Sequence, residues 1–366
     1  MKRIENYDLS AHNTFGMKVK AALYIEYDSV DELKSLDYKA LPQPVLHIGA
    51  GSNLLFTRDF PGTVLHSNIK FIKYVDMGFD EVLLTVGSGV VFDDFVANVA
   101  GNGLWGPENL SLIPGEVGAA AVQNIGAYGV EAKDIISGVV CLDTKDWSKT
   151  AFKVGELGYD YRDSRFKHER GRYIITSVLF RVTRKYSPKL DYGGVRAALE
   201  NRDLSALKPT DVREAIIGIR NAKLPDPAQI GSAGSFFKNP VIPRDHFERI
   251  VAAVANPSAN GKGPGRVPQG TPGPGIAPPK ATTATSVPHY DLPDGTVKVP
   301  AAWLIDQCGF RGMKLGGAQV YEKQPLVIVN ATGSATPEDV IALERQIISA
   351  VHEKFGIELH PEVDHI

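Results

Sequence analysis

The sequence predicts an α+β protein of three domains. Short apolar strands and separate amphipathic helices follow one another along the chain, and no internal repeat of fixed period is present. At 366 residues the chain is too long for one ordinary hydrophobic core and suits two or three domains. A composition of 43% hydrophobic and 22% charged residues is typical of globular domains with apolar interiors.

The first two predicted regions end near residues 70 and 222. In the first, the hydrophobic pattern predicts a strand at 22–27, a helix at 28–36 and a buried strand at 45–48. In the second, we expect a strand at 82–86, a helix at 91–100, Gly-rich loops from 101 to 129, strands at 137–143 and 173–184, and a helix at 210–221.

The third predicted region, residues 223–356, contains a sharp change of composition. Residues 256–288 hold 8 Pro and 6 Gly, and no aromatic or acidic residue. Such a segment cannot bury enough apolar surface to offset its ordering entropy, so we predict a disordered insertion. Around it and after it we expect helices at 244–255, 301–308 and 337–355, ordered chain at 295–299, and strands at 326–330 and 357–359. Thr336 is the predicted N-cap of the 337–355 helix.

Charge and cysteine content exclude several classes of protein. A formal net charge of -2 and a pI of about 6.5 give no basic field, so we expect neither nucleic acid nor an anionic membrane as a partner. The two cysteines cannot build a disulfide framework, and no Cys/His spacing resembles a zinc site. The N-terminal residues lack the apolar core of a signal peptide, and no stretch approaches a membrane span. We therefore expect a cytoplasmic protein without a metal.

Two Gly-rich runs favour a large nucleotide cofactor. Gly49-Ala-Gly-Ser-Asn53 follows a strand but lacks the third Gly of a dinucleotide fingerprint, although its amides could still hold a pyrophosphate. In the second run, from Leu112 to Gly129, small residues leave a backbone that can lie against a flat ligand. A tightly packed helix–strand junction would use the same residues and is the alternative interpretation.

The loop Gly231-Ser-Ala-Gly-Ser-Phe-Phe-Lys-Asn-Pro240 places a hydroxyl after small residues and before two aromatics. It could hold a nucleophile or proton donor at one position, and a tight turn with a buried Phe pair is the alternative. The segment 158–167 combines charges with aromatics. It is either a solvated loop with ion pairs or a partly buried site whose arginines need a carboxylate partner.

Nine motifs, in the same order, resemble the UDP-N-acetylenolpyruvoylglucosamine reductase family. They extend through nearly the whole chain, and the segment Tyr192-Gly-Gly194 is similar to the extra loop of the longer, type I members. The motifs are Asn13-Thr-Phe-Gly16, Gly49-Ala-Gly-Ser-Asn-Leu-Leu-Phe56, Ile113-Pro-Gly115, Gln123-Asn-Ile-Gly-Ala-Tyr-Gly129, Tyr161-Arg-Asp-Ser164, Lys223-Leu-Pro-Asp-Pro227, Gly234-Ser-Phe-Phe-Lys-Asn-Pro240, Trp303-Leu-Ile-Asp-Gln-Cys308 and Pro361-Glu-Val363.

The resemblance implies a two-lobed, VAO/PCMH-like FAD-binding region and an α+β substrate-binding domain. Residues 1–70 with the C-terminal strand 357–366 would form one lobe, residues 71–222 the other, and residues 223–356 the third domain. It also implies that NADPH reduces the flavin. Flavin N5 would then give hydride to the methylene carbon of an enolpyruvyl UDP-sugar, forming UDP-N-acetylmuramate for peptidoglycan synthesis. We expect a monomer.

The resemblance also implies the role of each site residue. Arg162 and Glu362 would stabilise the enolate-like intermediate, and Ser235 would donate the proton that completes the reduction. The residues implied to bind the cofactor are Gly49, Ala50, Gly51, Ser52, Asn53, Pro114, Gly115, Gln123, Asn124, Gly126, Ala127 and Tyr128. Those implied to bind the substrate are Tyr192, Lys223, Asn239 and Gln324.

Two departures from the family pattern concern the substrate domain. Many members carry Arg two places after the catalytic Glu, where this chain has Asp364, and an acid near a diphosphate would repel it. The Pro/Gly-rich insertion is the second departure, and we place it in a surface loop.

Two other functions fit parts of the sequence. One is an FAD-dependent oxidase of the same fold, which would need neither Ser235 nor Glu362. The other is a non-catalytic nucleotide-binding scaffold, which would purify without a yellow flavin.

Overall fold

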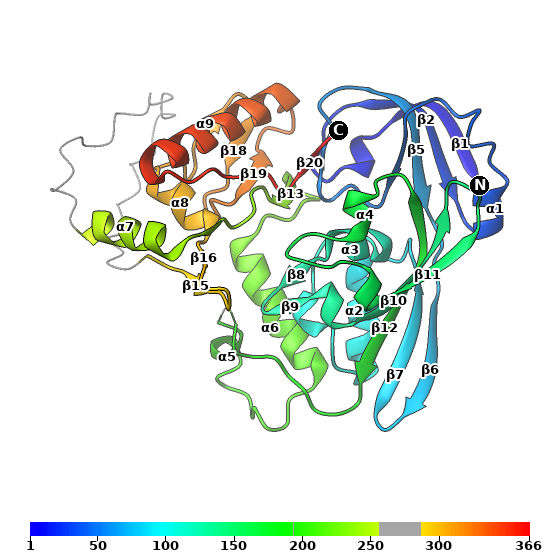
Figure 1. The fold of residues 1–366 in the computed structure, drawn as a ribbon, viewed down its shortest axis with the longest axis horizontal. Coiled ribbons are helices and arrows are strands. Elements are labelled where there is room, and N and C mark those ends of the chain that lie inside the picture. Colours follow the sequence, from blue (N-terminus) through cyan, green and yellow to red (C-terminus); the bar gives the residue numbers. More distant parts are fainter. Residues whose placement is uncertain (193, 256–286) are drawn as a thin grey trace. The chain divides into compact units, whose positions relative to one another are not determined.

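The computed structural model describes residues 1–192, 194–255 and 287–366 (Figure 1). Helices and strands are mixed, as the predicted α+β class requires. The chain divides into two compact units, whose ranges are 1–13, 18–52 and 58–223 for the first, and 14–17, 53–57 and 224–366 for the second. Most of the predicted insertion lies outside the described residues. Its last two residues are described, and Val287 is buried, so the insertion ends earlier than we predicted.

A four-stranded sheet forms the N-terminal part of the first unit. Its strands, in spatial order, are β1 (Lys2–Asp8), β2 (Lys20–Tyr27), β5 (Phe60–Ser67) and β3 (Val45–Ile48). β1 runs antiparallel to β2, whereas β2 and β3 are parallel to β5. The predicted strand at 45–48 forms, but at the sheet edge, where only Ile48 is buried. Helix α1 (Val30–Lys34) is shorter than predicted because Ser29 caps it, accepting from the amide of Glu32.

A five-stranded antiparallel sheet forms the rest of the first unit's core. Its order is β11 (Lys149–Lys153), β10 (Ile136–Asp143), β12 (Tyr173–Thr183), β7 (Glu81–Gly87) and β6 (Ile72–Gly78). Helices α2 (Phe92–Gly101) and α3 (Val117–Gln123) cover one face of this sheet (Figure 1). The ring of Phe95 on α2 stacks on Phe180 of β12 with centroids 4.3 Å apart, which fixes the helix on the sheet.

The prediction of loops throughout 101–129 was wrong, because α3 lies within this segment. Gly118 permits close packing: a Cβ built there would lie 2.9 Å from the Cβ of Ser88. Residues 117–123 therefore pack as a helix against the strand that precedes Ser88. After α3 comes a hairpin of β8 (Gly126–Ala127) and β9 (Val130–Glu131), whose two turn residues, Tyr128 and Gly129, both have positive φ.

Helix α6 (Pro209–Lys223) completes the first unit and packs its apolar residues, among them Val212 and Ile216, in a separate small core. The remaining short elements of this unit are η1 (Ser10–His12), η2 (Glu108–Leu110), η3 (Ala132–Asp134), η4 (Val154–Glu156), α4 (Arg165–His168) and α5 (Val195–Ala198).

The described residues of the second unit form three small sheets and three helices. One sheet has the order β13 (Gly231–Ser235), β19 (Val327–Asn330), β18 (Ala318–Val320) and β17 (Lys314–Leu315), and another has the order β14 (Val241–Ile242), β16 (Val297–Lys298) and β15 (Tyr290–Asp291). In the third, β20 (Asp364–His365) pairs in parallel with β4 (Leu54–Leu55). The helices are α7 (Arg244–Ala255), α8 (Ala301–Gln307) and α9 (Pro337–Phe355).

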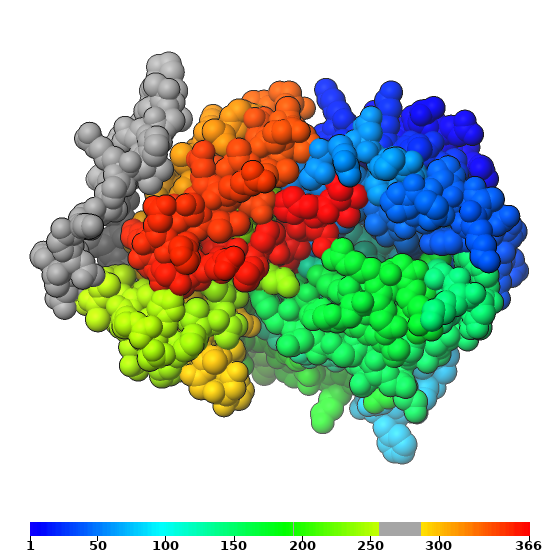
Figure 2. Space-filling model, turned by 45° about the horizontal axis from the view of Figure 1, so that its top comes forward, coloured from blue at the N-terminus to red at the C-terminus, as the bar shows by residue number. Residues whose placement is uncertain are grey.

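The C-terminal residues differ from the prediction. Residues 357–359 form no strand, because after Gly356 ends α9 with φ 65° the chain first pairs at Pro361, with Phe237. Residues 357–366, which we assigned to the first lobe, fall in the second unit together with β4. In Figure 2 they belong to the red end of the colour scale, and their apolar residues Ile357, Leu359 and Val363 are buried. Among the described residues, no helix is both long enough and apolar enough to cross a membrane.

Candidate active site

In the second unit, main-chain pairing brings Ser235 and Glu362 close to each other. Phe237 and Pro361 form an antiparallel bridge, and the amide of Glu362 donates to the carbonyl of Phe236 at 2.8 Å. The amide of Lys238 donates to the carbonyl of His360 at 2.9 Å. Glu362 therefore lies opposite Phe236, the residue that follows Ser235. In the sequence, Glu362 stands 127 positions after Ser235.

The β13 strand presents the Ser235 hydroxyl at the surface. Its pairing with β19 shifts register between Ser232 and Ser235, where Gly234 has φ +73°. Phe236 and Phe237 are 0% and 1% exposed, whereas Ser235 is exposed. The aromatic pair thus anchors the loop while the hydroxyl stays accessible, which is the geometry expected of a proton donor held at one position.

Asn53 fixes the backbone of Glu362. Its side-chain Nδ2 donates to the carbonyl of Glu362 at 3.0 Å, and its own carbonyl accepts from the amide of Asp364 at 3.0 Å. The structure therefore gives Asn53, which we expected at the cofactor, a role in positioning the predicted catalytic acid. Asp364, the departure from the family pattern, is a partly buried residue of β20.

In the first unit, a tight turn presents Arg162. Asp160 and Asp163 exchange backbone hydrogen bonds of 3.2 and 3.1 Å across the turn, and Arg162 has φ +54°. A non-glycine residue in this region costs on the order of 1 kcal/mol, so the surrounding contacts hold it there. The Arg162 guanidinium donates to the carbonyls of Asn124 at 3.3 Å and Gly126 at 2.6 Å. It is therefore held against the second Gly-rich run.

Asn124 links the Arg162 turn to that run. It ends α3 in the left-handed region and is fully buried. Its Nδ2 donates to the carbonyl of Asp160 at 2.8 Å and to Glu131 at 3.2 Å, and its Oδ1 accepts from the amide of Lys133 at 3.0 Å. These bonds use the side chain of Asn124 inside the protein and hold the backbone between the Arg162 turn and the second Gly-rich run in place.

The two Gly-rich runs lie against each other in the first unit. The hydroxyl of Ser52 donates to the carbonyl of Pro114 at 3.0 Å, and a Cβ built on Gly115 would lie 2.9 Å from that hydroxyl oxygen. At Gly51, φ is +68° and a Cβ would lie 2.0 Å from the carbonyl oxygen of His12, so only glycine fits.

The loop at 50–52 fits an anionic group. In the described part of the chain, the amides of Ala50, Gly51 and Ser52 donate no hydrogen bond to another residue, although Gly51 is buried. Buried amides need acceptors, and phosphate oxygens are suitable ones. These residues therefore fit the diphosphate of a dinucleotide cofactor.

Gln123, Ala127 and Tyr128 extend the second run. Gln123 is the last residue of α3 and is 9% exposed, and the half-buried Tyr128 occupies the β8–β9 turn. Burial raises the pKa of the Tyr128 hydroxyl, so this group is a neutral hydrogen-bond donor over the ordinary pH range.

The four predicted substrate residues divide between the units. In the first unit, a Cβ built on Gly129 would lie 3.2 Å from the Cβ of Tyr192, and Lys223 is the exposed last residue of α6. In the second unit, the Oδ1 of Asn239 accepts from the amide of Ala301 at 2.9 Å, at the start of α8. The Oε1 of Gln324 accepts from the amide of Leu326 at 3.4 Å. The last two side chains thus also support local turns.

The sequence analysis missed Arg220, on α6. Its Nε is buried without a hydrogen-bond partner among the described residues, and burial lowers the pKa of its guanidinium. Tyr128 and Asp93 are the groups whose charges act on it. A signal was present, because Arg220 stands three residues before Lys223 and so lies on the same helix face. A partly buried guanidinium whose Nε has no acceptor is suited to an anionic ligand.

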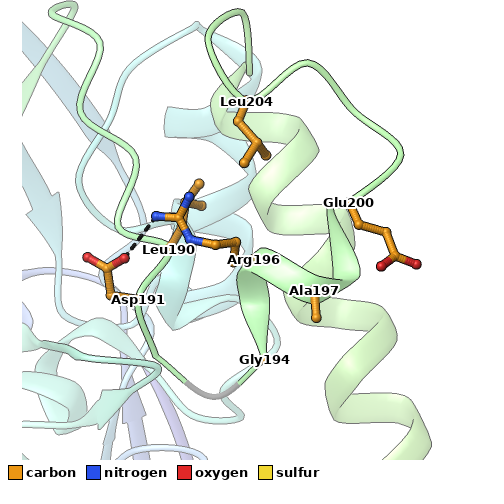
Figure 3. Close-up of a pocket in the computed structure, with 7 residues that line it drawn as sticks. All are labelled: Leu190, Asp191, Gly194, Arg196, Ala197, Glu200 and Leu204. Atoms are coloured by element: carbon orange, nitrogen blue, oxygen red, sulfur yellow. Dashed lines mark hydrogen bonds and ion pairs between the residues drawn. The ribbon is translucent and has the colours of Figure 1, made fainter.

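A pocket of about 570 Å³ in the first unit has a different character (Figure 3). It lies between the segment before α5 and α5 itself, and Arg196 and Asp191 form an ion pair of 2.9 Å at its rim. Its other lining residues are Leu190, Gly194, Ala197, Glu200 and Leu204. None of the predicted site residues lines it. No group of three or more His, Cys, Asp or Glu residues in the described chain could hold a metal ion.

Comparison with known proteins decides the family. A UDP-N-acetylenolpyruvoylglucosamine reductase from Bacteroides fragilis is 45% identical over 364 residues, which cover 99% of each chain. This chain belongs to the UDP-N-acetylenolpyruvoylglucosamine reductase family. Reductases of the same name from Porphyromonas gingivalis and Chromobacterium violaceum are 42% and 41% identical, over 99% and 97% of this chain and 98% and 96% of theirs.

Both parts of the reductase family architecture are found along the chain. The profile of the UDP-N-acetylenolpyruvoylglucosamine reductase C-terminal domain matches residues 226–366, and that of an FAD binding domain matches residues 21–146. The crystal structure of the reductase from Thermus caldophilus superposes with a TM-score of 0.63 at 23% identity, covering 100% of this chain and 98% of that one. The α+β, multi-domain fold and the FAD-binding domain are thereby confirmed.

Proposed function

We propose that this protein is an NADPH-dependent flavoenzyme that reduces UDP-N-acetylglucosamine enolpyruvate to UDP-N-acetylmuramate. Family membership supports the reaction, and the pairing that places Glu362 beside Ser235 is the observation that carries the chemistry. The Gly49–Asn53 loop would hold FAD, which when bound would supply the hydride-transfer chemistry between NADPH and the substrate. We infer that the enzyme is cytoplasmic, because NADPH and nucleotide sugars are cytoplasmic metabolites, and we propose that it is a monomer. Light scattering of the purified protein tests the oligomeric state.

Two residues stabilise the charge that develops on the substrate. Hydride addition to the enol ether creates an enolate-like dianion at the neighbouring carboxylate-bearing carbon, which preorganised donors stabilise. Arg162 supplies a permanent positive charge, and its turn and hydrogen bonds to the Gly-rich run hold it in place. Glu362 acts on the same group, and Asn53 fixes its backbone.

Ser235 then supplies the proton. A serine hydroxyl is a weak acid, so it serves only a strongly basic carbanion. Its exposed position on a loop anchored by two buried aromatics fits this role. The diphosphate and uridine of the substrate would be bound by Tyr192, Lys223, Asn239 and Gln324, together with the additional residue Arg220.

The absorbance spectrum of the purified protein tests the proposal. A yellow protein whose flavin band is bleached by NADPH without oxygen, and restored by the enolpyruvyl sugar nucleotide, is the expected result. Rapid recovery with oxygen but not with this substrate would instead indicate an oxidase, and a colourless protein that binds no FAD would indicate a non-catalytic scaffold.

A further inference from the structure

A buried imidazole joins two carboxylates in the first unit, outside the set of residues assigned to catalysis. The Nε2 of His66 on β5 lies 2.8 Å from Oε1 of Glu116, and its Nδ1 lies 3.1 Å from Oε2 of Glu26. The hydroxyl of Tyr24 lies 3.0 Å from the same Nδ1 and donates to Glu26 at 3.0 Å. Because an ionised carboxylate only accepts hydrogen bonds, a carboxylate at each ring nitrogen favours the imidazolium form of His66, in which both nitrogens donate.

Glu116 stands beside the loop that carries the open amides. Its Oε2 lies 3.3 Å from the position of a Cβ built on Gly49, and Ala50, Gly51 and Ser52 follow directly. The side chains of His66 and Glu116 are each 9% exposed, so water screens them poorly. A negative charge therefore lies next to the amides that fit a diphosphate. It would repel that group unless a cation offset it.

We propose that His66 is a charge-compensating residue of the cofactor site, which neutralises Glu116 and so permits the diphosphate of FAD to bind at the Gly49–Asn53 loop. This inference rests on the FAD-binding part of the proposed function. It assigns to His66 and Glu116 a role in cofactor affinity that neither residue has in the reaction described above.

Of the three histidines near this cluster, His66 is the one whose pKa is raised, whereas the pKa values of His12 and His47 are lowered. Burial acts to lower the pKa of His66, but the hydrogen bonds and charges of Glu116 and Glu26 outweigh burial and raise it. His12, with its ring centroid 5.4 Å from that of His66, and His47 both have pKa values lowered by burial, that of His47 to about 3. The further charged or titratable groups that act on this cluster include Tyr24, Tyr27, Lys2 and Tyr7.

The sign of the pH dependence follows. Because the pKa of His66 is raised above 6.5, its charge is complete below that value and is lost as the pH rises through the folded-state pKa. The affinity for FAD should therefore fall as the solution becomes more alkaline.

Equilibrium binding of FAD to the flavin-free protein tests this proposal. Quenching of flavin fluorescence gives Kd between pH 5.5 and 9 for the wild type and for H66Q, E116Q and the double variant H66Q/E116Q. His352→Gln, on the exposed side of α9, is the matched control. We expect H66Q to bind FAD about ten-fold more weakly at pH 7. The double variant should recover to within about two-fold of the wild type, because the uncompensated carboxylate is gone.

The possible outcomes distinguish an effect of the His66 charge on FAD affinity from a loss of folded structure. A double variant as weak as H66Q, or an H66Q protein with wild-type affinity, would overturn the proposal while leaving the proposed function intact. Failure of the wild type to bind FAD would refute the proposed function itself. If H66Q does not fold, as circular dichroism would show, E116Q alone decides: it must bind FAD more tightly than the wild type at pH 9, where the charge of His66 no longer offsets Glu116, and equal affinity there contradicts the proposal.

Discussion

At the residue scale, Ser235 can be separated from its surroundings by one substitution. Ser235→Ala removes the hydroxyl but keeps the buried aromatic anchors, so the loop should keep its conformation. We expect NADPH to bleach the flavin at the wild-type rate, while reoxidation by the enolpyruvyl substrate slows by about 10²–10⁴-fold, the usual contribution of a general acid. Stopped-flow absorbance measures both half-reactions. Ser334→Ala, at another exposed serine, should change neither, and equal losses in both half-reactions of Ser235→Ala would remove it from the role of donor.

The role of a single residue could be predicted from the sequence where a motif contains it. It could not be predicted where the role depends on the contacts that the residue makes in the fold. The motif around Ser235 indicated both its hydroxyl and its aromatic anchors. Asn124 was placed in the cofactor site because it belongs to a motif, but only coordinates show that its side chain is used up by Asp160, Glu131 and Lys133. Arg220 belongs to no motif that we recognised. It is notable because its Nε is buried, and this burial arises only when helix α6 packs in the fold.

At the scale of elements, helix α9 shows why some segments were predicted to the residue. Its start carries two independent signals, a capping threonine and a following proline, and both are realised. Helix α3 offered neither signal, because no capping side chain precedes it and Gly118 disfavours a helix, although the three alanines that follow favour one. Close packing of Gly118 against Ser88 helps to hold α3 in place. The strand predicted at 357–359 had a suitable pattern but no partner in the described sheets, and a pattern alone cannot supply one.

The cap of α9 gives a prediction at this scale. Thr336 accepts from the amide of Asp339 at 3.2 Å, and Asp339 accepts from the amide of Thr336 at 3.1 Å. Thr336→Ala should therefore lower the free energy of unfolding by about 1 kcal/mol. Ser349→Ala, at an exposed position of the same helix, should not destabilise the protein because alanine favours helices. Chemical denaturation of the two variants measures the difference, and equal stability would show that the cap contributes nothing.

At the scale of the whole molecule, the order of the motifs along the chain predicted more than any single local pattern did. Nine short motifs in sequence indicated the family and the α+β fold, whereas the division of the chain into units could not be read from them. The chain passes between units at short segments, 14–17 and 53–57, that have no unusual composition. Segment 53–57 belongs to the second unit because β4 pairs with β20. Pairing between strands so far apart in the chain cannot be recognised from the local sequence.

Deletion of the Pro/Gly-rich segment is the test at this scale. Its composition predicts that residues 258–285 contribute no apolar core, so joining the flanking residues through a short Gly-Ser linker should change the free energy of unfolding by less than about 1 kcal/mol. The boundary matters, because Val287 is 5% exposed and packs inside the second unit. A longer deletion through Pro288 removes this side chain and should destabilise the protein by about 1–3 kcal/mol. Thermal and urea unfolding of the two deletions compare them directly, and a large loss already in the shorter one would show that the segment is part of a folded core.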